Sequence, residues 1–331
     1  MPDSSTPSGL DARAFWVTAP ARGELREERL QSPADRQVLV RTLYSGVSRG
    51  TEALIFNGQV PPSEYDRMRA PFQAGEFPGP VKYGYANVGV VEYGPESLRN
   101  RHVFTLFPHQ TRFVVAEQNV RVIPDNVPPE RAVLAANMET ALNGVWDGDA
   151  QAGDRILVIG AGTVGCLVAW LAARLPGTSV ELADVNPNRR SIADRLGVRF
   201  VAPEEAAGNA DLVFHASATS AGLDLAIDRA GFEATIVELS WYGNRPVTIN
   251  LGAAFHASRL TIRSSQVGAV ARSHRDRFSV DRRMEVALSL LTNPELDALI
   301  TGESAFEELP AVMARLAKEP GDTICHRIRY S

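Results

Sequence analysis

The sequence predicts an α/β protein in which a β-rich part is followed by a doubly wound parallel sheet. Three observations support this prediction. Short strand-like runs separated by turn residues fill residues 13–127. After residue 128, apolar strands alternate with helical segments, as in sheets joined by crossover helices. The length of 331 residues, 44% of them apolar, suits about two domains. We therefore expect one domain over 1–127, a second over 128–292 and a closing segment over 293–331.

The first part of the chain is expected to contain few helices. Its clearest strands are predicted at 37–43, 88–93 and 111–116. The segment from Asn57 to Pro80 is too rich in proline and glycine for a regular element, and it is long for a plain connection. A loop of this size is often a lid, and we expect one here.

The second part is expected to begin with a helix opened by Pro128-Pro129-Glu130. Its predicted strands are 155–159, 179–183, 212–215 and 235–240, and its predicted helices are 163–175, 188–196 and 222–229. The closing segment is predicted to hold a strand at 297–301, a helix at 306–317 and a strand at 325–330. This alternation indicates parallel strands with helices between them.

Charge and composition exclude several classes of partner and location. The formal charge of −5 comes from 34 basic and 39 acidic residues without long runs, so nucleic acid is not an expected partner. Residues 156–173 carry no charge, but glycines in their first half favour a strand, turn and helix over a membrane span. Two cysteines and no signal-like start predict a cytoplasmic protein, with residues 1–10 as a mobile tail.

A glycine-rich turn, residues 160–165, joins the apolar strand 155–159 to its helix. In this context Gly160 permits the tight turn, Gly162 lets a diphosphate approach the backbone, and Gly165 lets the helix pack closely on the strand. Free N–H groups at the helix start, at Thr163 and Val164, suit an anion. The sequence therefore predicts a dinucleotide site, and an incidental glycine turn is the alternative.

An acidic residue follows the next strand. Asp184 comes 24 residues after Gly160, where a carboxylate can accept both hydroxyls of a ribose and repels a 2′-phosphate. NAD(H) is therefore favoured over NADP(H). Arg189 and Arg190 leave the matter open, because they could accommodate a phosphate or could simply be solvated.

The β-rich part, the GAGTVG turn and the closing segment together resemble the medium-chain dehydrogenase/reductase superfamily over nearly the whole chain. The resemblance implies a GroES-like catalytic domain, completed by residues 293–331, and a Rossmann domain, with a cleft between them. The segments SGVSRGTE, PVKYGYANVG, LFPHQTRFVV and ELSWYGNRP also resemble bacterial proteins loosely called zinc-type alcohol dehydrogenases and, more distantly, bacteriochlorophyllide dehydrogenase.

The zinc ligands of that superfamily are not matched. Its zinc enzymes carry Gly-Ile-Cys and Gly-His-Glu segments, which correspond here to Gly46-Val47-Ser48 and Gly84-Tyr85-Ala86. The third ligand, a cysteine near residues 137–139, has no counterpart, and residues 92–113 lack the four cysteines of a structural zinc lobe. Serine and tyrosine are poor zinc ligands, so we expect no metal.

Without zinc, side chains must stabilise a developing alkoxide and deliver a proton. Tyr85 is the first candidate, because the resemblance places it beside the nicotinamide, although it could be a packed aromatic. Ser48 could bind the substrate oxygen or finish a turn, and His109 could relay a proton or be structural. Glu139, in an apolar helix, is either a functional acid or the partner of an arginine.

Further coenzyme contacts are expected from other loops. Arg49 matches a position where superfamily members contact the diphosphate. The loops at 215–217, 240–242 and 264–268 follow predicted strand ends, which places Ser217, Ser240 and Gln266 on the nicotinamide side or in ordinary turns.

We therefore predict a zinc-independent NAD(H)-dependent oxidoreductase that moves a hydride between nicotinamide and a small-molecule alcohol or carbonyl. A zinc-free enoyl or quinone reductase is one alternative, and a nicotinamide-binding protein without chemistry is another. The resemblance also implies a homodimer joined through edge strands near residues 260–265.

Overall fold

The computed structural model describes residues 10–331, so the expected mobile tail lies almost entirely outside the described residues. The chain divides into two compact units. Of the described residues, the first unit contains 10–136 and 300–331, and the second contains 137–299. The chain thus leaves the first unit once and returns to it at its end.

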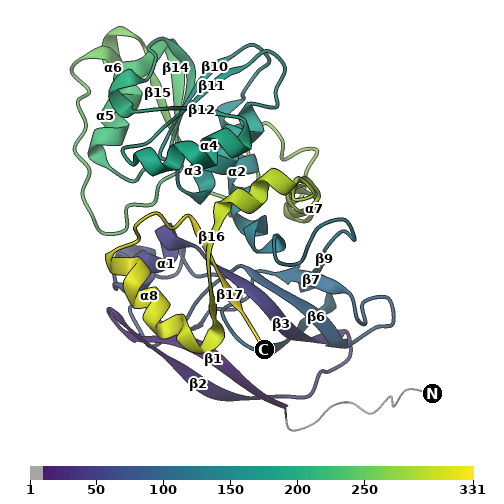
Figure 1. Ribbon diagram of the computed structural model, residues 1–331. Helices are drawn as coiled ribbons and strands as arrows, with labels where there is room; N and C mark the ends of the chain where they lie inside the picture. Colours follow the sequence, from purple (N-terminus) through teal and green to yellow (C-terminus); the bar gives the residue numbers. More distant parts are fainter. Residues whose placement is uncertain (1–9) are drawn as a thin grey trace. The chain divides into compact units, whose positions relative to one another are not determined.

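The first unit consists mainly of antiparallel strands. One sheet has the order β2-β1-β5-β4, and a larger one has the order β16-β17-β3-β6-β7-β9, with β8 also paired to β3. Figure 1 shows the yellow β17 beside the purple β3, although they are distant in sequence. The strands are β1 (Leu10–Ala19), β2 (Arg22–Leu30), β3 (Gln37–Val47), β4 (Ala74–Gly75), β5 (Val81–Lys82), β6 (Asn87–Tyr93), β7 (His102–Thr105), β8 (Arg112–Ala116), β9 (Arg121–Val122), β16 (Ile300–Ala305) and β17 (Cys325–Arg329).

Valines on alternate strand positions form the core of this sheet. Val38 and Val40 of β3 lie on one face with Val91 of β6 and Val115 of β8, and all four are at most 3% exposed. β-branched side chains favour extended backbone, so local preference and burial agree here. The helices of the unit are α1 (Arg49–Phe56), α8 (Leu309–Lys318) and the short 3₁₀ helices Pro62–Glu64, Glu117–Asn119, Ala132–Leu134 and Phe306–Glu308.

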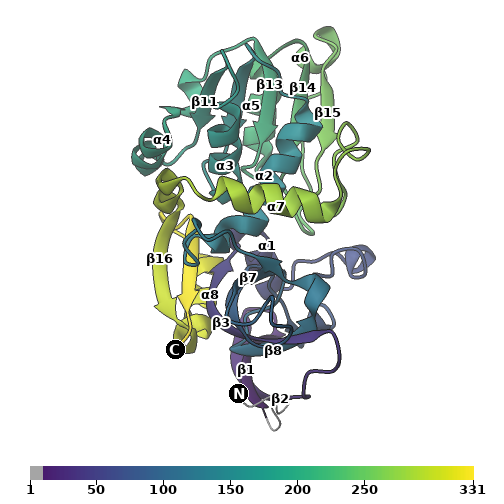
Figure 2. The same ribbon diagram turned by 90° about the vertical axis from the view of Figure 1, so that its right-hand side faces the viewer.

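The second unit contains a six-stranded parallel sheet. Its order is β12-β11-β10-β13-β14-β15, in which the chain runs outward from β10 in one direction and then in the other. Figure 2 shows this order from β11 to β15. Its strands are β10 (Arg155–Ile159), β11 (Ser179–Ala183), β12 (Arg199–Val201), β13 (Ala210–His215), β14 (Ala230–Glu238) and β15 (Thr261–Ser264).

Helices pack on this sheet and connect its strands. α3 contacts β10 and β11, while α5 contacts β13 and β14. The helices are α2 (Ala135–Gly148), α3 (Thr163–Ala172), α4 (Arg190–Leu196), α5 (Ser220–Arg229), α6 (Ala254–Ala257) and α7 (Val280–Leu290), with 3₁₀ helices at Pro187–Arg189, Pro203–Glu205 and Pro294–Leu299. The reversal of strand order between β10 and β13 is the place where ligands bind in sheets of this kind.

The predicted fold class is confirmed, and most predicted elements are present. The strand predicted at 297–301 is wrong, because Pro294 opens a 3₁₀ helix over Pro294–Leu299 and β16 begins only at Ile300. Leu296 and Leu299 point into the core at a spacing of three, which suits a 3₁₀ turn. Within residues 10–331, no helix combines the length and the apolar character needed to cross a bilayer.

Candidate coenzyme and catalytic sites

The glycine turn after β10 has the geometry that a diphosphate requires. Gly160 has φ +104°, and a Cβ there would come 2.7 Å from the backbone nitrogen of Ser217. A Cβ on Gly165 would come 1.8 Å from the carbonyl oxygen of Gly160, so α3 approaches the strand too closely for a side chain. A Cβ on Gly162 would meet nothing within 4 Å, which leaves open space at the start of α3. This arrangement fits an anion bound at a helix N-terminus.

Asp184 lies directly after β11 and is tied to this turn. Its Oδ2 accepts a hydrogen bond of 2.6 Å from the backbone N–H of Ala161, and its Oδ1 accepts one of 2.8 Å from Asn186. Each carboxylate oxygen can accept a second hydrogen bond. Asp184 therefore helps to hold the turn and keeps acceptor capacity for ribose hydroxyls.

Arg189 is buried at 5% exposure, so it is not a solvated residue of the helix start. Burial raises the pKa of the Cys166 thiol to about 12, and the Arg189 charge acts in the opposite direction. Arg189 therefore lies near Cys166 on α3. Arg190 is exposed, and its guanidinium lies over the Phe200 ring at 4.9 Å.

The loops after β13 and β14 hold a chain of hydrogen-bonded side chains, which we name the His215 network. His215 contacts Glu238 through Nδ1 and Ser217 through Nε2, at 2.7 Å in both cases. Ser217 also contacts Thr219 at 2.9 Å, and the Tyr242 hydroxyl donates to Glu238 at 2.9 Å. The loops predicted to line the nicotinamide side contain His215 and Tyr242, whereas Glu238 was not predicted as a site residue.

Two other predicted loop residues have local roles. Ser240 accepts a hydrogen bond of 3.0 Å from the backbone of Ala218, which joins the loops after β13 and β14. Gln266 accepts one of 2.7 Å from Gly268 and caps its own turn. A coenzyme contact for either residue stays a prediction.

In the first unit, three hydroxyl side chains gather at the start of α1. Burial, together with the charge of Glu52, raises the pKa of Tyr85 to about 12, although hydrogen bonding by Ser48 and Thr51 acts in the opposite direction. Tyr85 and Ser48 are both partly exposed. The structure thus brings these two predicted residues together and adds Thr51, which sequence reasoning missed. Tyr83 is 6% exposed and packs edge-on against Tyr85.

Behind these hydroxyls lies a second set of side chains, which we name the His109 network. The Nδ1 of His109 lies 2.7 Å from Ser45, and its Nε2 lies 2.8 Å from Glu52. Ser45 also contacts the Tyr330 hydroxyl at 2.9 Å. These four side chains are at most 7% exposed. The other oxygen of Glu52 accepts a hydrogen bond of 2.8 Å from the backbone N–H of Ser48. Glu52 therefore links His109 to Ser48.

Glu139 and Arg49 form hydrogen bonds to other residues. Glu139 forms a buried ion pair of 3.1 Å with Arg283, which matches the arginine-partner alternative, and a catalytic role for it stays a prediction. Arg49 donates a hydrogen bond of 3.1 Å to the Thr323 carbonyl within the first unit.

The residues at the expected zinc positions do not fit zinc. Ser48 and Tyr85 offer hydroxyls, and among residues 10–331 no three His, Cys, Asp or Glu side chains come together as metal ligands would. No reaction step is therefore derived through a metal.

Comparison with known protein sequences finds matches to part of the chain. No protein-family model matches the chain. The L-threonine 3-dehydrogenase of Rhizobium rhizogenes is 32% identical over 117 residues, which is 35% of this chain and 33% of that enzyme. The enzyme of the same name from Mesorhizobium japonicum is 34% identical over 87 residues, 26% of this chain and 25% of that enzyme. The match thus spans a third or less of the curated relatives.

Solved structures match over almost the whole chain. L-idonate 5-dehydrogenase from Escherichia coli has a TM-score of 0.80 at 14% identity and covers 98% of this chain and 100% of its own. A protein from Sinorhizobium meliloti, solved with NADP and described as a zinc-binding dehydrogenase, has a TM-score of 0.77 at 16% identity, with 97% and 99% covered. A protein from Escherichia coli, solved with NADH and described as a short chain alcohol dehydrogenase, has a TM-score of 0.77 at 17% identity, with 97% of this chain and 100% of its own covered. The chain therefore has the fold of these dehydrogenases, which confirms the predicted fold.

Proposed function

We propose that this chain is an oxidoreductase that transfers a hydride between NAD(H) and a small-molecule alcohol or carbonyl without zinc. The glycine turn carries the proposal, because Gly162 leaves open space at the start of α3 while Gly160 and Gly165 permit no side chain. The names of the matched relatives, which are dehydrogenases, support it. When bound, the coenzyme supplies or accepts the hydride.

The residues of the second unit account for coenzyme binding and selectivity. The start of α3 is suited to the diphosphate, and Asp184 to the adenosine ribose. A negative carboxylate at that position favours NAD(H), although the solved neighbours include one with NADP. We propose Arg49, Arg189, Ser217, Ser240 and Gln266 as further contacts.

The hydroxyls of the first unit account for binding of the substrate oxygen. A hydrogen bond from Tyr85 or Ser48 to that oxygen would stabilise negative charge as it develops. A phenol with a pKa of about 12 is neutral at pH 7 and is therefore a hydrogen-bond donor. His109 lies behind them, where it orients Glu52. We further propose a cytoplasmic homodimer, for which β15 supplies a sheet edge whose outer side pairs with no strand among residues 10–331.

Coenzyme binding is tested by Gly162→Ala. The added Cβ meets no protein atom, so the fold should be retained, but it fills the space of the diphosphate. We expect at least a tenfold loss of affinity for NADH, measured by calorimetry with NADPH in parallel. Gly208→Ala is the matched control, because its Cβ is equally free of contacts. Equal binding by the wild type and Gly162→Ala would contradict the site.

Tyr85 is tested after a screen of alcohols, ketones, enones and quinones with both coenzymes. Tyr85→Phe removes the hydroxyl and keeps the ring packed on Tyr83. We expect kcat to fall about a hundredfold with unchanged NADH affinity. Elemental analysis of chelator-washed enzyme checks the metal, and stoichiometric zinc in active protein would contradict zinc independence.

A further inference from the structure

The hydrogen bonds of the His215 network fix where its protons lie. The Glu238 carboxylate accepts from the backbone of Ser240 at 2.8 Å and from the Tyr242 hydroxyl at 2.9 Å. Burial alone would raise the pKa of Glu238, but hydrogen bonding by His215 and by Ser240 holds it below its ordinary value. An ionised carboxylate can only accept, so Nδ1 of His215 must donate to it.

The same argument gives the protonation of the second ring nitrogen of His215, Nε2. With the proton of neutral His215 on Nδ1, Nε2 is an acceptor, and Ser217 must donate to it. Thr219 accepts from the backbone of Gly222 at 3.0 Å and is therefore free to donate its own proton to Ser217. The result is one continuous chain of donors from Thr219 through Ser217 to His215.

Exposure to solvent increases along these hydrogen bonds from His215 to Thr219. His215 is fully buried, Ser217 is partly buried and Thr219 is exposed. The network therefore connects a buried imidazole to the surface, and imidazole is the side chain whose ordinary pKa suits proton exchange near pH 7.

The surrounding backbone is shaped to hold Ser217. A Cβ on Gly222 would come 2.2 Å from the Ser217 hydroxyl and 2.7 Å from Nε2 of His215, so the first turn of α5 closes over both. Ala218 has φ +53°, a left-handed conformation that costs an alanine energy and is concentrated at functional sites. On its other side, Ser217 borders Gly160 of the coenzyme turn.

We propose that Ser217 and His215 form the proton relay of the oxidoreductase, an inference that rests on the proposed function. During alcohol oxidation the substrate C–H bond breaks and its hydride reduces the nicotinamide. The substrate hydroxyl proton passes to Ser217 Oγ while the Ser217 proton moves to Nε2 of His215. The substrate becomes a carbonyl, and His215 becomes an imidazolium opposite the Glu238 carboxylate. Carbonyl reduction reverses each transfer.

In this assignment Ser217 is a catalytic residue, because it exchanges a proton directly with the substrate oxygen. His215 and Glu238 act through Ser217 and are positioning residues. Two titratable groups are hydrogen-bonded to His215: Glu238, the last residue of β14, and Tyr242 in the loop after β14. The charge of Arg245 acts on Tyr242. These groups define the pH dependence of the relay.

The first arm of the test needs no turnover. In protein labelled with ¹⁵N-histidine, NMR should show neutral His215 with its proton on Nδ1, assigned by the loss of its signals in His215→Gln. Ser217→Ala should keep this tautomer and change the His215 titration. A proton on Nε2 in the wild type, or an unchanged titration, would overturn the relay even in an active enzyme.

The second arm measures kinetics in Ser217→Ala. We expect kcat to fall about a hundredfold and the limb of its pH profile due to His215 to disappear. Ser304→Ala is the matched control, because it removes the hydroxyl 3.1 Å from another buried histidine, His326. An unchanged pH profile would refute the relay. A wild type that binds coenzyme but turns over no substrate would instead refute the proposed function.

Discussion

His109 and His215 have the same kinds of partner, but the networks around them differ in exposure. Each imidazole lies between a glutamate and a serine, and each network includes a tyrosine hydroxyl. In the His109 network every side chain is at most 7% exposed. In the His215 network Ser217 and Tyr242 are partly buried and Thr219 is exposed.

The difference follows from what the networks connect. The His109 network joins β3, α1, the segment before β8 and the residue after β17. Four segments of the first unit thus meet in one satisfied polar cluster, which a fold needs when polar groups are buried. The His215 network joins only two loops at the carboxyl ends of neighbouring strands, β13 and β14. The same side chains therefore stabilise the fold in one unit and can exchange a proton in the other.

The largest expected effect comes from Glu52→Ala. The substitution leaves Nε2 of His109 and the backbone N–H of Ser48 without their acceptor, and the side chains of Glu52 and His109 are at most 3% exposed. We expect the free energy of unfolding of the first unit to fall by about 3 kcal/mol. Hydrogen exchange of peptides from each unit in urea measures the two units separately.

Glu238→Ala is the matched comparison, with an expected loss of about 1 kcal/mol in the second unit because water can replace part of the carboxylate. Equal losses for Glu52→Ala and Glu238→Ala would contradict the distinction between the two networks.

A third buried histidine, His326, has no hydrogen bond to a glutamate in the described part of the chain and can be compared with His109 and His215. His326 contacts Ser304 through Nε2, its Nδ1 has no partner among residues 10–331, and its ring packs on Gly302. Burial lowers the pKa of His326, and Arg315 lowers it further, against the smaller effects of Glu303 and Glu308. Below pH of about 6.5 the unfolded chain therefore binds a proton that the folded chain does not, so stability should fall as pH decreases.

This loss of stability at lower pH should be smaller than the loss caused by Glu52→Ala, and it should level off below the pKa of His326 in the folded protein. Denaturant midpoints between pH 7.5 and 5 measure it, with His326→Gln as the control that removes this part of the decline. A decline that is the same in both proteins would assign the pH dependence to other groups.

The sequence was informative where structure is local. The strands Arg155–Ile159 and Ser179–Ala183 and the glycine turn have the predicted bounds, because apolar runs and glycines act over a few residues. The networks depend on pairings of distant residues, such as Ser45 with Tyr330, which no spacing rule reveals.

One network had a detectable signal in the sequence. His215 and Glu238 are the last residues of neighbouring parallel strands and are paired in register. Predicting both strand ends and their adjacency would have placed the two side chains together. The strand was instead predicted to end at 240, so Glu238 was assigned to its interior.

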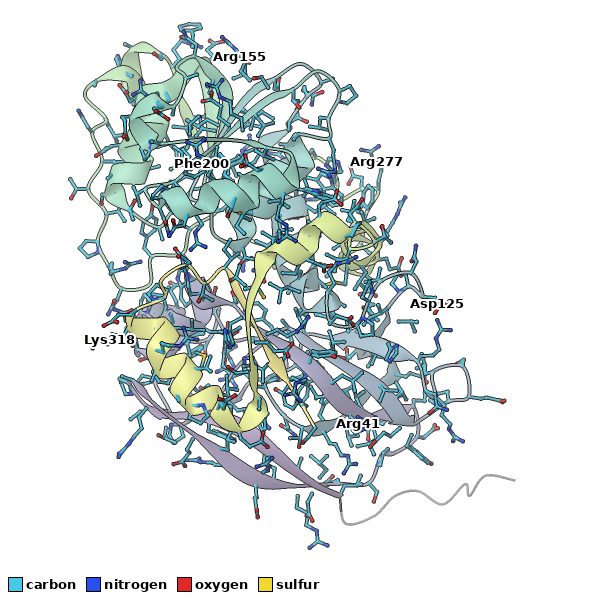
Figure 3. The ribbon with its side chains drawn as sticks, in the orientation of Figure 1. Arg41, Asp125, Arg155, Phe200, Arg277 and Lys318 are labelled. Carbon is cyan, nitrogen blue, oxygen red and sulfur yellow. The ribbon has the colours of Figure 1, made fainter. Side chains whose placement is uncertain are left out.

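The smallest effect is expected for an ion pair at the surface. Arg155, at the start of β10 (Figure 3), donates to both carboxylate oxygens of Asp211 at 3.0 and 2.7 Å, and both side chains are well exposed. Hydrogen bonding by Arg155 lowers the pKa of Asp211 to about 2. The ionised carboxylate therefore stabilises the fold above its unfolded pKa of about 4, and this contribution is lost as pH falls towards 2.

Solvent and salt screen such a pair, so Asp211→Asn should change the free energy of unfolding less than any substitution above, and the change should vanish in molar salt. Denaturation of both proteins at 0.05 and 1 M NaCl measures this. If Asp211→Asn were as destabilising as Glu52→Ala and insensitive to salt, burial would not be what separates the networks. A small, salt-sensitive effect would place Glu52, Glu238 and Asp211 in one series ordered by their access to water.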